Sequence, residues 1–287
     1  MNASSKLGPG PRTALPFLAL LLVGFVAPLL TVIAFSFMPA RTFSIWQAPS
    51  FANYATIFEG SNYISFLWSL GLASTTVILL ALICYPVAYG LVRVFGRWST
   101  ALTLLFVIPL FVSENVRLYG WVLFLIKNGL LLGSVKTLFG VELESILFTQ
   151  TAILIGMVYV YFPFMLFPMS LGIAMVPNEV RESAADLGAS RWQVFREVEL
   201  PLSMPGIIIG FLLTFVLAVG AIAEAKVLGG QKVIPITHDI EIAFTYAQNW
   251  PLGAALAVLL MLVVGVLVLI VLRRFDLDAV LGRRRAP

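Results

Sequence analysis

Long apolar runs separated by short polar segments dominate the pattern of this chain. Six such runs lie at about 14–37, 66–92, 101–126, 148–173, 204–223 and 252–272. A helix needs about 20 mainly apolar residues to cross the hydrocarbon core of a bilayer, and each run has that length. The pattern therefore predicts an all-α integral membrane protein with six transmembrane helices.

The first run follows two basic residues, Lys6 and Arg12, as the apolar core of a cleaved signal peptide would. Such a core is about 7–15 residues long, which is shorter than the run at 14–37. We therefore expect an uncleaved first span, with residues 1–13 as a flexible cytoplasmic tail.

Composition supports lipid as the solvent of this chain. Hydrophobic residues make up 60% of it and charged residues only 11%, whereas a soluble domain carries about 25% charged residues. The one cysteine, Cys84, lies inside an apolar run and cannot form an intrachain disulfide, so we interpret it as a small buried residue.

The distribution of basic residues predicts the orientation of the spans. Cytoplasmic loops carry an excess of Lys and Arg. Twelve of the 18 basic residues fall in the termini and in the loops after spans two and four, which places both termini in the cytoplasm and makes residues 276–287 a basic tail after one domain at 14–275. The twelve are Lys6, Arg12, Arg93, Arg97, Arg181, Arg191, Arg196, Arg273, Arg274, Arg283, Arg284 and Arg285.

The predicted cytoplasmic loop between spans four and five has the signals of two helices joined by a bend. Asn178 is a candidate N-cap, and Glu182 in the first turns favours the helix dipole. Gly188 suits a helix-ending position with positive φ. Ser190 and Gln193 form a capping-box pattern for a second helix, which we expect to end at Pro201 and Pro205, before span five.

The spacing in this loop resembles the EAA loop of permeases in binding-protein-dependent ABC importers. Glu182 and Ala184 are followed by Gly188 and, after nine further residues, by Val198-x-Leu200-Pro201. The family pattern is Glu-Ala-Ala, three residues, Gly, nine residues, Ile-x-Leu-Pro. Ser183 and Val198 depart from it by small changes that preserve shape.

The resemblance implies a type I importer permease fold in a bacterial cytoplasmic membrane. It also implies that the loop forms a coupling helix in a cleft of an ATPase subunit. The implied partners are a second homologous permease, two ATPase copies that bind ATP and Mg²⁺, and an extracytoplasmic substrate-binding protein. The implied coupling residues are Glu182, Ser183, Ala184, Ala185, Asp186, Gly188, Leu200 and Pro201.

Catalytic motifs are missing from the sequence. The nearest match to a phosphate loop, Gly229-Gly230-Gln231-Lys232, lacks the spacing and the hydroxyl. The single histidine, His238, is expected in a solvated external loop, and no metal-ligand pattern is present. We therefore expect no enzymatic activity and no cofactor in this chain, and a membrane enzyme is disfavoured.

Two further segments resemble the first-subunit spermidine/putrescine permeases. One runs from Val107 to Trp121 and on through Lys127-Asn128-Gly129-Leu130-Leu131, and the other joins Leu228-Gly229-Gly230 to residues 249–256. With the EAA loop, the resemblance covers about residues 14–275 and implies a polyamine as cargo. These segments also occur in permeases for other small organic solutes, so an opine, an amino-acid-like compound or an organophosphonate stays an alternative.

Charged residues within or beside the spans are candidates for a substrate pathway, because intramembrane charges usually face a protein interior or a water-filled path. Glu114 and Arg117 lie in the outer half of span three, where an i, i+3 ion pair is the alternative interpretation. Glu224 is expected at the outer end of span five. Aromatic faces would also attract a cation, and the candidates are Tyr119, Trp121, Tyr159 and Tyr161.

A stand-alone secondary transporter is the rival from another class. It would be expected to carry charged relays inside several spans and inverted repeats. Spans one, two and six are nearly bare of charge, and the sequence shows no internal repeat.

Overall fold

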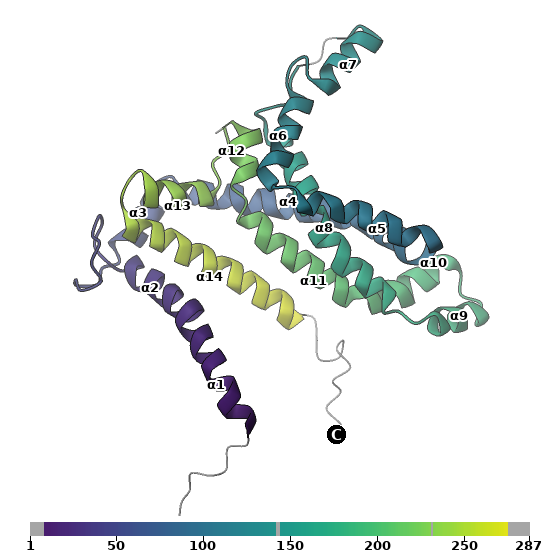
Figure 1. Ribbon diagram of the computed structural model, residues 1–287, viewed down its shortest axis with the longest axis horizontal. Helices are drawn as coiled ribbons and strands as arrows, with labels where there is room; N and C mark the ends of the chain where they lie inside the picture. Colours follow the sequence, from purple (N-terminus) through teal and green to yellow (C-terminus); the bar gives the residue numbers. More distant parts are fainter. Residues whose placement is uncertain (1–8, 142–143, 231, 275–287) are drawn as a thin grey trace, which may run out of the picture. The chain divides into compact units, whose positions relative to one another are not determined.

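The computed structural model describes residues 9–141, 144–230 and 232–274, and helices account for most of them (Figure 1). The chain divides into two compact units, one of residues up to 63 with 236–263 and the other of 64–235 with 264 onward. Each unit is considered by itself below. The predicted basic tail at 276–287 and residues 1–8 lie outside the described residues.

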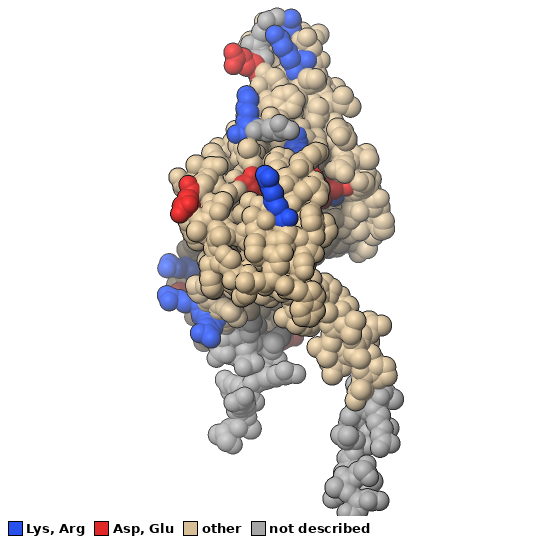
Figure 2. Space-filling model, turned by 90° about the vertical axis from the view of Figure 1, so that its left-hand side faces the viewer, with Lys and Arg blue, Asp and Glu red and all other residues tan. Residues whose placement is uncertain are grey.

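Six helical segments of the described chain are long and apolar enough to cross a membrane, as the sequence predicts. Figure 2 shows one face of the molecule, where uncharged residues form broad surfaces and charged side chains gather in small groups. Five of the six helical segments coincide with predicted runs, and the third segment, Glu114–Phe139, does not coincide with the predicted run at 101–126. The segments are Leu15–Ser36, Asn62–Val94, Glu114–Phe139, Gln150–Ala174, Arg191–Val219 and Trp250–Arg274.

The first unit contains the N-terminal span and the segment before the last span. Its elements are α1 (Pro9–Leu21), η1 (Leu22–Val26), α2 (Ala27–Ser36), α3 (Ala52–Glu59), the start of α4 (Asn62–Tyr89), α13 (Ile236–Thr245) and the first part of α14 (Trp250–Arg274). Helix α1 begins at Pro9, so the prediction of a flexible tail is wrong for residues 9–13.

Polar and aromatic contacts connect the shorter elements of this unit to its long helices. The buried Asn53 side chain donates to the carbonyls of Ser36 (3.1 Å) and Met38 (2.7 Å) and so ties α3 to the end of α2. The Trp250 ring packs against Phe43 and Phe244. His238 lies in α13, half-buried, with Nδ1 3.5 Å from the Glu241 carboxylate, so its expected place in a solvated loop is wrong.

The second unit contains the central spans and both candidate sites. Its elements are the rest of α4, η2 (Gly90–Val94), η3 (Gly96–Trp98), α5 (Ser99–Val107), η4 (Ile108–Phe111), α6 (Glu114–Leu125), α7 (Leu130–Phe139), α8 (Gln150–Ala174), α9 (Asn178–Asp186), α10 (Arg191–Gln193), η5 (Val194–Glu199), α11 (Leu200–Val219), α12 (Ala223–Gly229) and the rest of α14.

The third predicted span, 101–126, is not one helix, and this prediction is wrong. Helix α5 passes into the 3₁₀ turn η4 at Ile108, and the backbone is extended at Val112 and Ser113 before α6 starts. Pro109 supplies no N–H to a continuing α-helix, and Glu114 is placed in the first turn of α6, where the dipole favours an acidic residue.

Helices α8 and α11 form the tightest packing of the unit. Their backbones meet at Gly172 and Gly206, where an added Cβ on either residue would come within 2.8 Å of backbone atoms of the other. Glycine is required here because the helices approach more closely than side chains allow. Spans four and five are therefore joined along their backbones as one body.

Candidate functional site

The loop between α8 and α11 folds as the sequence predicts at its bend. Gly188 has φ +88°, its N–H donates to Ala185 O (2.9 Å), and the Ala189 N–H donates to Ala184 O (3.1 Å). These two bonds make a Schellman motif at the end of α9. The Ser190 N–H donates to Gln193 Oε1 (2.8 Å) and the Gln193 N–H to Ser190 Oγ (3.3 Å), which confirms the capping box.

The start of α9 differs from the prediction. Pro177 occupies the N-cap position, and Asn178 is the first residue of the helix, so the predicted cap is wrong. The Asn178 Oδ1 instead accepts from Arg93 Nη1 (2.7 Å) and from Arg181 Nη1 (3.3 Å). Two arginine donors thus take the acceptor that the cap would have used.

The end of the loop also differs, because the second helix does not stop before span five. Residues 191–219 run through α10, the π-helical η5 and α11 without a break. The π turns of η5 end at Glu199 and shift the hydrogen-bond register just before Pro201, which lets the helix continue through that proline, and Pro205 lies inside α11.

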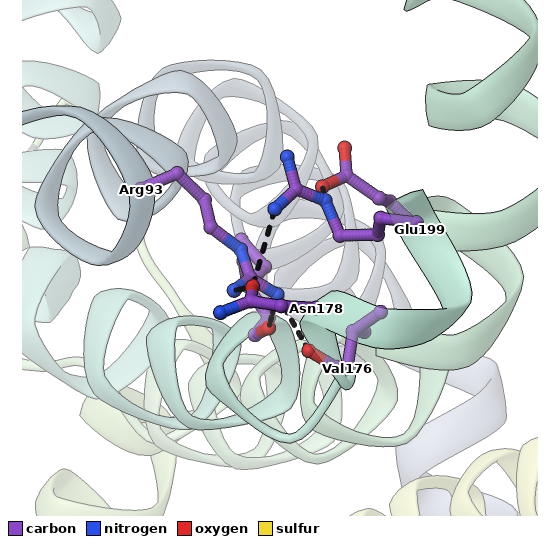
Figure 3. A network of polar contacts seen from close by, with 6 residues as sticks. Arg93, Val176, Asn178 and Glu199 are labelled. Carbon is purple, nitrogen blue, oxygen red and sulfur yellow. Dashed lines mark hydrogen bonds and ion pairs between the residues drawn. The ribbon is translucent and has the colours of Figure 1, made fainter. Parts of the chain in front are cut away.

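Arginine side chains join this loop to neighbouring elements (Figure 3). Arg93 Nη2 donates to the carbonyls of Ile173 (3.0 Å) and Val176 (2.7 Å) at the end of α8. Arg181 of α9 forms an ion pair with Glu199 of η5, which is 3% exposed. This network is not predicted by any motif in the sequence, although a glutamate at the start of an apolar run indicates a need for a buried partner.

The face of α9 that carries the proposed coupling residues is open. Glu182, Ser183, Ala185, Asp186 and Gly188 are exposed, Ala184 and Leu200 are half-buried, and Pro201 is exposed. Beside this face lies a polar groove of about 460 Å³. Its lining residues are Tyr89, Arg181, Glu182, Ala185, Ala189, Arg191, Val194 and Glu199.

A second group of polar residues surrounds Glu224, which lies in α12 rather than at the end of span five. Helix α12 is held by the Phe148 N–H, which donates to Leu228 O (2.9 Å), and by Leu228, which packs on Gly156 of α8. The Glu224 side chain is fully buried, and neither carboxylate oxygen has a hydrogen-bond partner of ordinary geometry among the described residues.

Glu114, Arg117 and Tyr161 are the charged and polar neighbours of Glu224. Burial above all raises the pKa of Glu224, to about 7; nearby Glu114 acts in the same direction, and the Tyr161 hydroxyl and Arg117 oppose the shift. The structure thus brings together residues from α6, α8 and α12 that the sequence analysis singled out separately.

Arg117 faces an aromatic ring rather than an acidic partner. Its Cζ lies 5.9 Å from the Tyr159 ring centroid, and Trp121 packs edge-on against the same ring at 5.6 Å. Nε and Nη1 of Arg117 are buried and have no hydrogen-bond partner in the described part of the chain. Within that part of the chain, Arg117 forms no i, i+3 ion pair with Glu114. Tyr119 is 60% exposed and is not part of this group of residues.

Trp121 and Tyr159 also line an apolar groove of about 590 Å³ between α4, α5, α6 and α8. The remaining lining residues are almost all apolar and include Phe106, Pro109 and Phe162. Tyr159 therefore contacts both this apolar groove and Arg117.

Comparisons with known proteins agree with this geometry. A family described as binding-protein-dependent transport system inner membrane component matches residues 77–278. Spermidine/putrescine transport system permease protein PotB of Haemophilus influenzae is 34% identical over 250 residues, covering 86% of this chain and 87% of the relative. PotB of Escherichia coli (strain K12) is 32% identical over 224 residues, covering 76% and 80%.

Solved structures show the same fold at lower sequence identity. A bacterial ABC transporter that imports the acidic polysaccharide alginate aligns with a TM-score of 0.73 and 17% identity, covering 92% of this chain and 95% of that chain. An alginate transporter in complex with a pentasaccharide-bound periplasmic protein gives 0.72 and 19%, covering 91% of each.

The six apolar helices and the bent loop between the fourth and fifth define a multi-pass membrane permease of the type I importer fold. The chain belongs to the family of binding-protein-dependent transport system inner membrane components and is a permease subunit of an ABC importer.

Proposed function

We propose that this chain forms half of the translocation pathway of an importer for polyamines and is driven by separate ATPase subunits that dock on α9. The observation that carries the proposal is the exposed face of α9 between the Arg93 contacts and the Gly188 bend. A short helix fixed at both ends can transmit a push as a rigid body.

The assembly that this function needs has several further parts. A second homologous permease would complete the pathway, two ATPase copies would bind ATP and Mg²⁺, and a substrate-binding protein would dock on the outer side. The basic residues at the α4 and α9 ends, among them Arg93 and Arg181, support a cytoplasmic position for α9 and for both termini.

Polyamine cargo is supported by the relatives and by the charge around Glu224. Two carboxylates, Glu114 and Glu224, lie near one guanidinium, Arg117, so the group carries an excess of negative charge when both carboxyls are ionised. The ring of Tyr159 already receives a cation, Arg117. An ammonium group entering this region would find both a carboxylate without a hydrogen-bond partner of ordinary geometry and aromatic faces.

The test is uptake by the reconstituted importer. Proteoliposomes containing this chain, the second permease and the ATPase should accumulate labelled spermidine or putrescine when ATP is inside and the binding protein outside. Uptake without ATP would contradict the importer mechanism. If the binding protein retains an opine, an amino-acid-like compound or an organophosphonate and no polyamine, the mechanism holds and the cargo assignment fails.

A further inference from the structure

Arg93 occupies a position from which it can connect the second span to the coupling helix. It lies in η2, the continuation of α4 at the end of the second span, and is half-buried. Its guanidinium donates to Ile173 O, in the last turn of α8, and to Val176 O, just after that helix ends. A positive charge there also favours the helix dipole.

The same guanidinium reaches the first residue of α9. Arg93 Nη1 donates to Asn178 Oδ1 at 2.7 Å, and Arg181 Nη1 donates to the same oxygen at 3.3 Å. Arg181 then pairs with the buried Glu199 of η5. Figure 3 shows that these side chains form one connected series from η2 through α9 to η5.

Packing makes the contribution of Arg93 distinct. Helices α8 and α11 are already joined backbone to backbone at Gly172 and Gly206, so they need no polar link to move together. The end of span two has no such glycine contact with α9, and its polar connection to α9 in the described chain is the Arg93–Asn178 bond. Past η2 the chain turns at Gly96, with φ +46°.

We infer that Arg93 is a positioning residue through which displacement of α9 by the ATPase reaches the second span, with Asn178 as its partner on α9. This inference rests on the proposed function. It assigns the task to one guanidinium because the fixed fork of donors on Arg93 reaches three acceptors, Asn178 Oδ1, Ile173 O and Val176 O, at once.

The experiment measures cargo transported per ATP hydrolysed by the assembled importer in proteoliposomes. Coupling between sites is typically about 5–150-fold, and we expect Arg93→Ala to lower this ratio about tenfold while ATP hydrolysis continues. Asn178→Ala, which removes one acceptor, should lower it less. Arg97→Ala is the matched control, because Arg97 is exposed and its guanidinium lies over the ring of the neighbouring Trp98.

A second readout keeps the test independent of cargo. In a Cys84→Ala background, spin labels at Val94 and at Val180, an exposed residue of α9, should keep their separation when ATP binds in the parental complex, and the separation should change in Arg93→Ala. If Arg93→Ala assembles poorly, Arg93→Lys and Asn178→Ala carry the test. A parental transport ratio in these variants, or an equal loss in Arg97→Ala, would overturn the inference. Failure of the parental complex to couple ATP to uptake would instead refute the proposed function.

Discussion

Two glutamates in the described part of the chain are almost completely buried, and they differ in what surrounds them. Glu199 is 3% exposed and pairs with Arg181 between α8 and α11, whereas Glu224 is 0% exposed and has no hydrogen-bond partner of ordinary geometry among the described residues. A buried carboxylate costs free energy unless it is paired. The pairing of Glu199 is typical of a structural joint, and its absence at Glu224 is typical of a residue available to a passing ligand.

The largest effect should come from changes on the exposed side of the loop. Gly188→Pro requires φ near −65° where the chain has +88°, and it should abolish ATP-driven uptake without preventing membrane insertion. Glu182→Lys should do the same by reversing charge on the exposed face of α9. Gly71→Ala is the control, because nothing lies within 4 Å of the added Cβ. Normal uptake by both variants would show that α9 does not couple ATP hydrolysis to transport.

A smaller loss is expected on the Glu224 side of the comparison. Glu224→Gln keeps the shape and removes the charge, and since a hydrogen bond to a charged group is worth about 1.5–3 kcal/mol, cation uptake should fall about tenfold or more. Glu114→Gln should act in the same direction, and exposed Glu144→Gln should have no effect. Parental uptake by both pathway variants would show that the cargo does not use these carboxylates.

Substitutions at the Arg181–Glu199 ion pair should change the stability of the folded chain. Arg181→Ala leaves a buried carboxylate unpaired and should lower the free energy of unfolding by about 1–3 kcal/mol, measured by thermal unfolding in detergent. Arg196→Ala, an exposed arginine of the same loop, is the control. Replacing both partners, as Arg181→Met with Glu199→Leu, should restore much of the loss. If Glu224→Gln destabilises the chain as strongly as Arg181→Ala, the two glutamates do not differ in role.

The smallest effect should be a pH dependence specific to Glu224. Its pKa is about 7 instead of the ordinary 4.5, so the folded chain binds this proton more tightly than the unfolded chain. The stability from this group is therefore complete below pH 4.5 and is lost as the pH rises through 7.

Transport should change in the opposite direction to stability. The charged fraction of Glu224 rises from about 0.1 at pH 6 to about 0.9 at pH 8, so cation uptake should increase by less than about tenfold over this range. Glu224→Gln should flatten the profile. An unchanged profile in that variant would assign the titration to another group.

Sequence patterns predicted the local features of the loop because their causes are local. The Gly188 bend and the Ser190–Gln193 capping box need only residues within a few positions of each other. Asn178 failed as a cap because its acceptor is taken by Arg93, 85 residues away. No pattern around Asn178 contains that information.

The mispredicted helix ends have a local cause that hydropathy does not report. The break at Val112 and Ser113 interrupts an apolar run that hydropathy reads as continuous, and the π turns before Pro201 carry a helix through a residue that usually ends one. The charged and aromatic residues near Glu224 could be chosen one by one, because charges beside spans are rare. Their convergence from α6, α8 and α12 depends on packing at Leu228 and Gly156, which sequence spacing does not encode.

The most direct test of the proposed function is whether α9 contacts the ATPase subunit. Ser183→Cys in a Cys84→Ala background places a single thiol on the exposed face of α9, since Cys84 is the only cysteine of the chain. We predict an ATP-sensitive cross-link between this thiol and the ATPase in the assembled importer, and no cross-link from Tyr119→Cys, an exposed position on α6. An introduced thiol on α9 that is labelled only from the outer side of the membrane, or that never cross-links to the ATPase, would contradict the account.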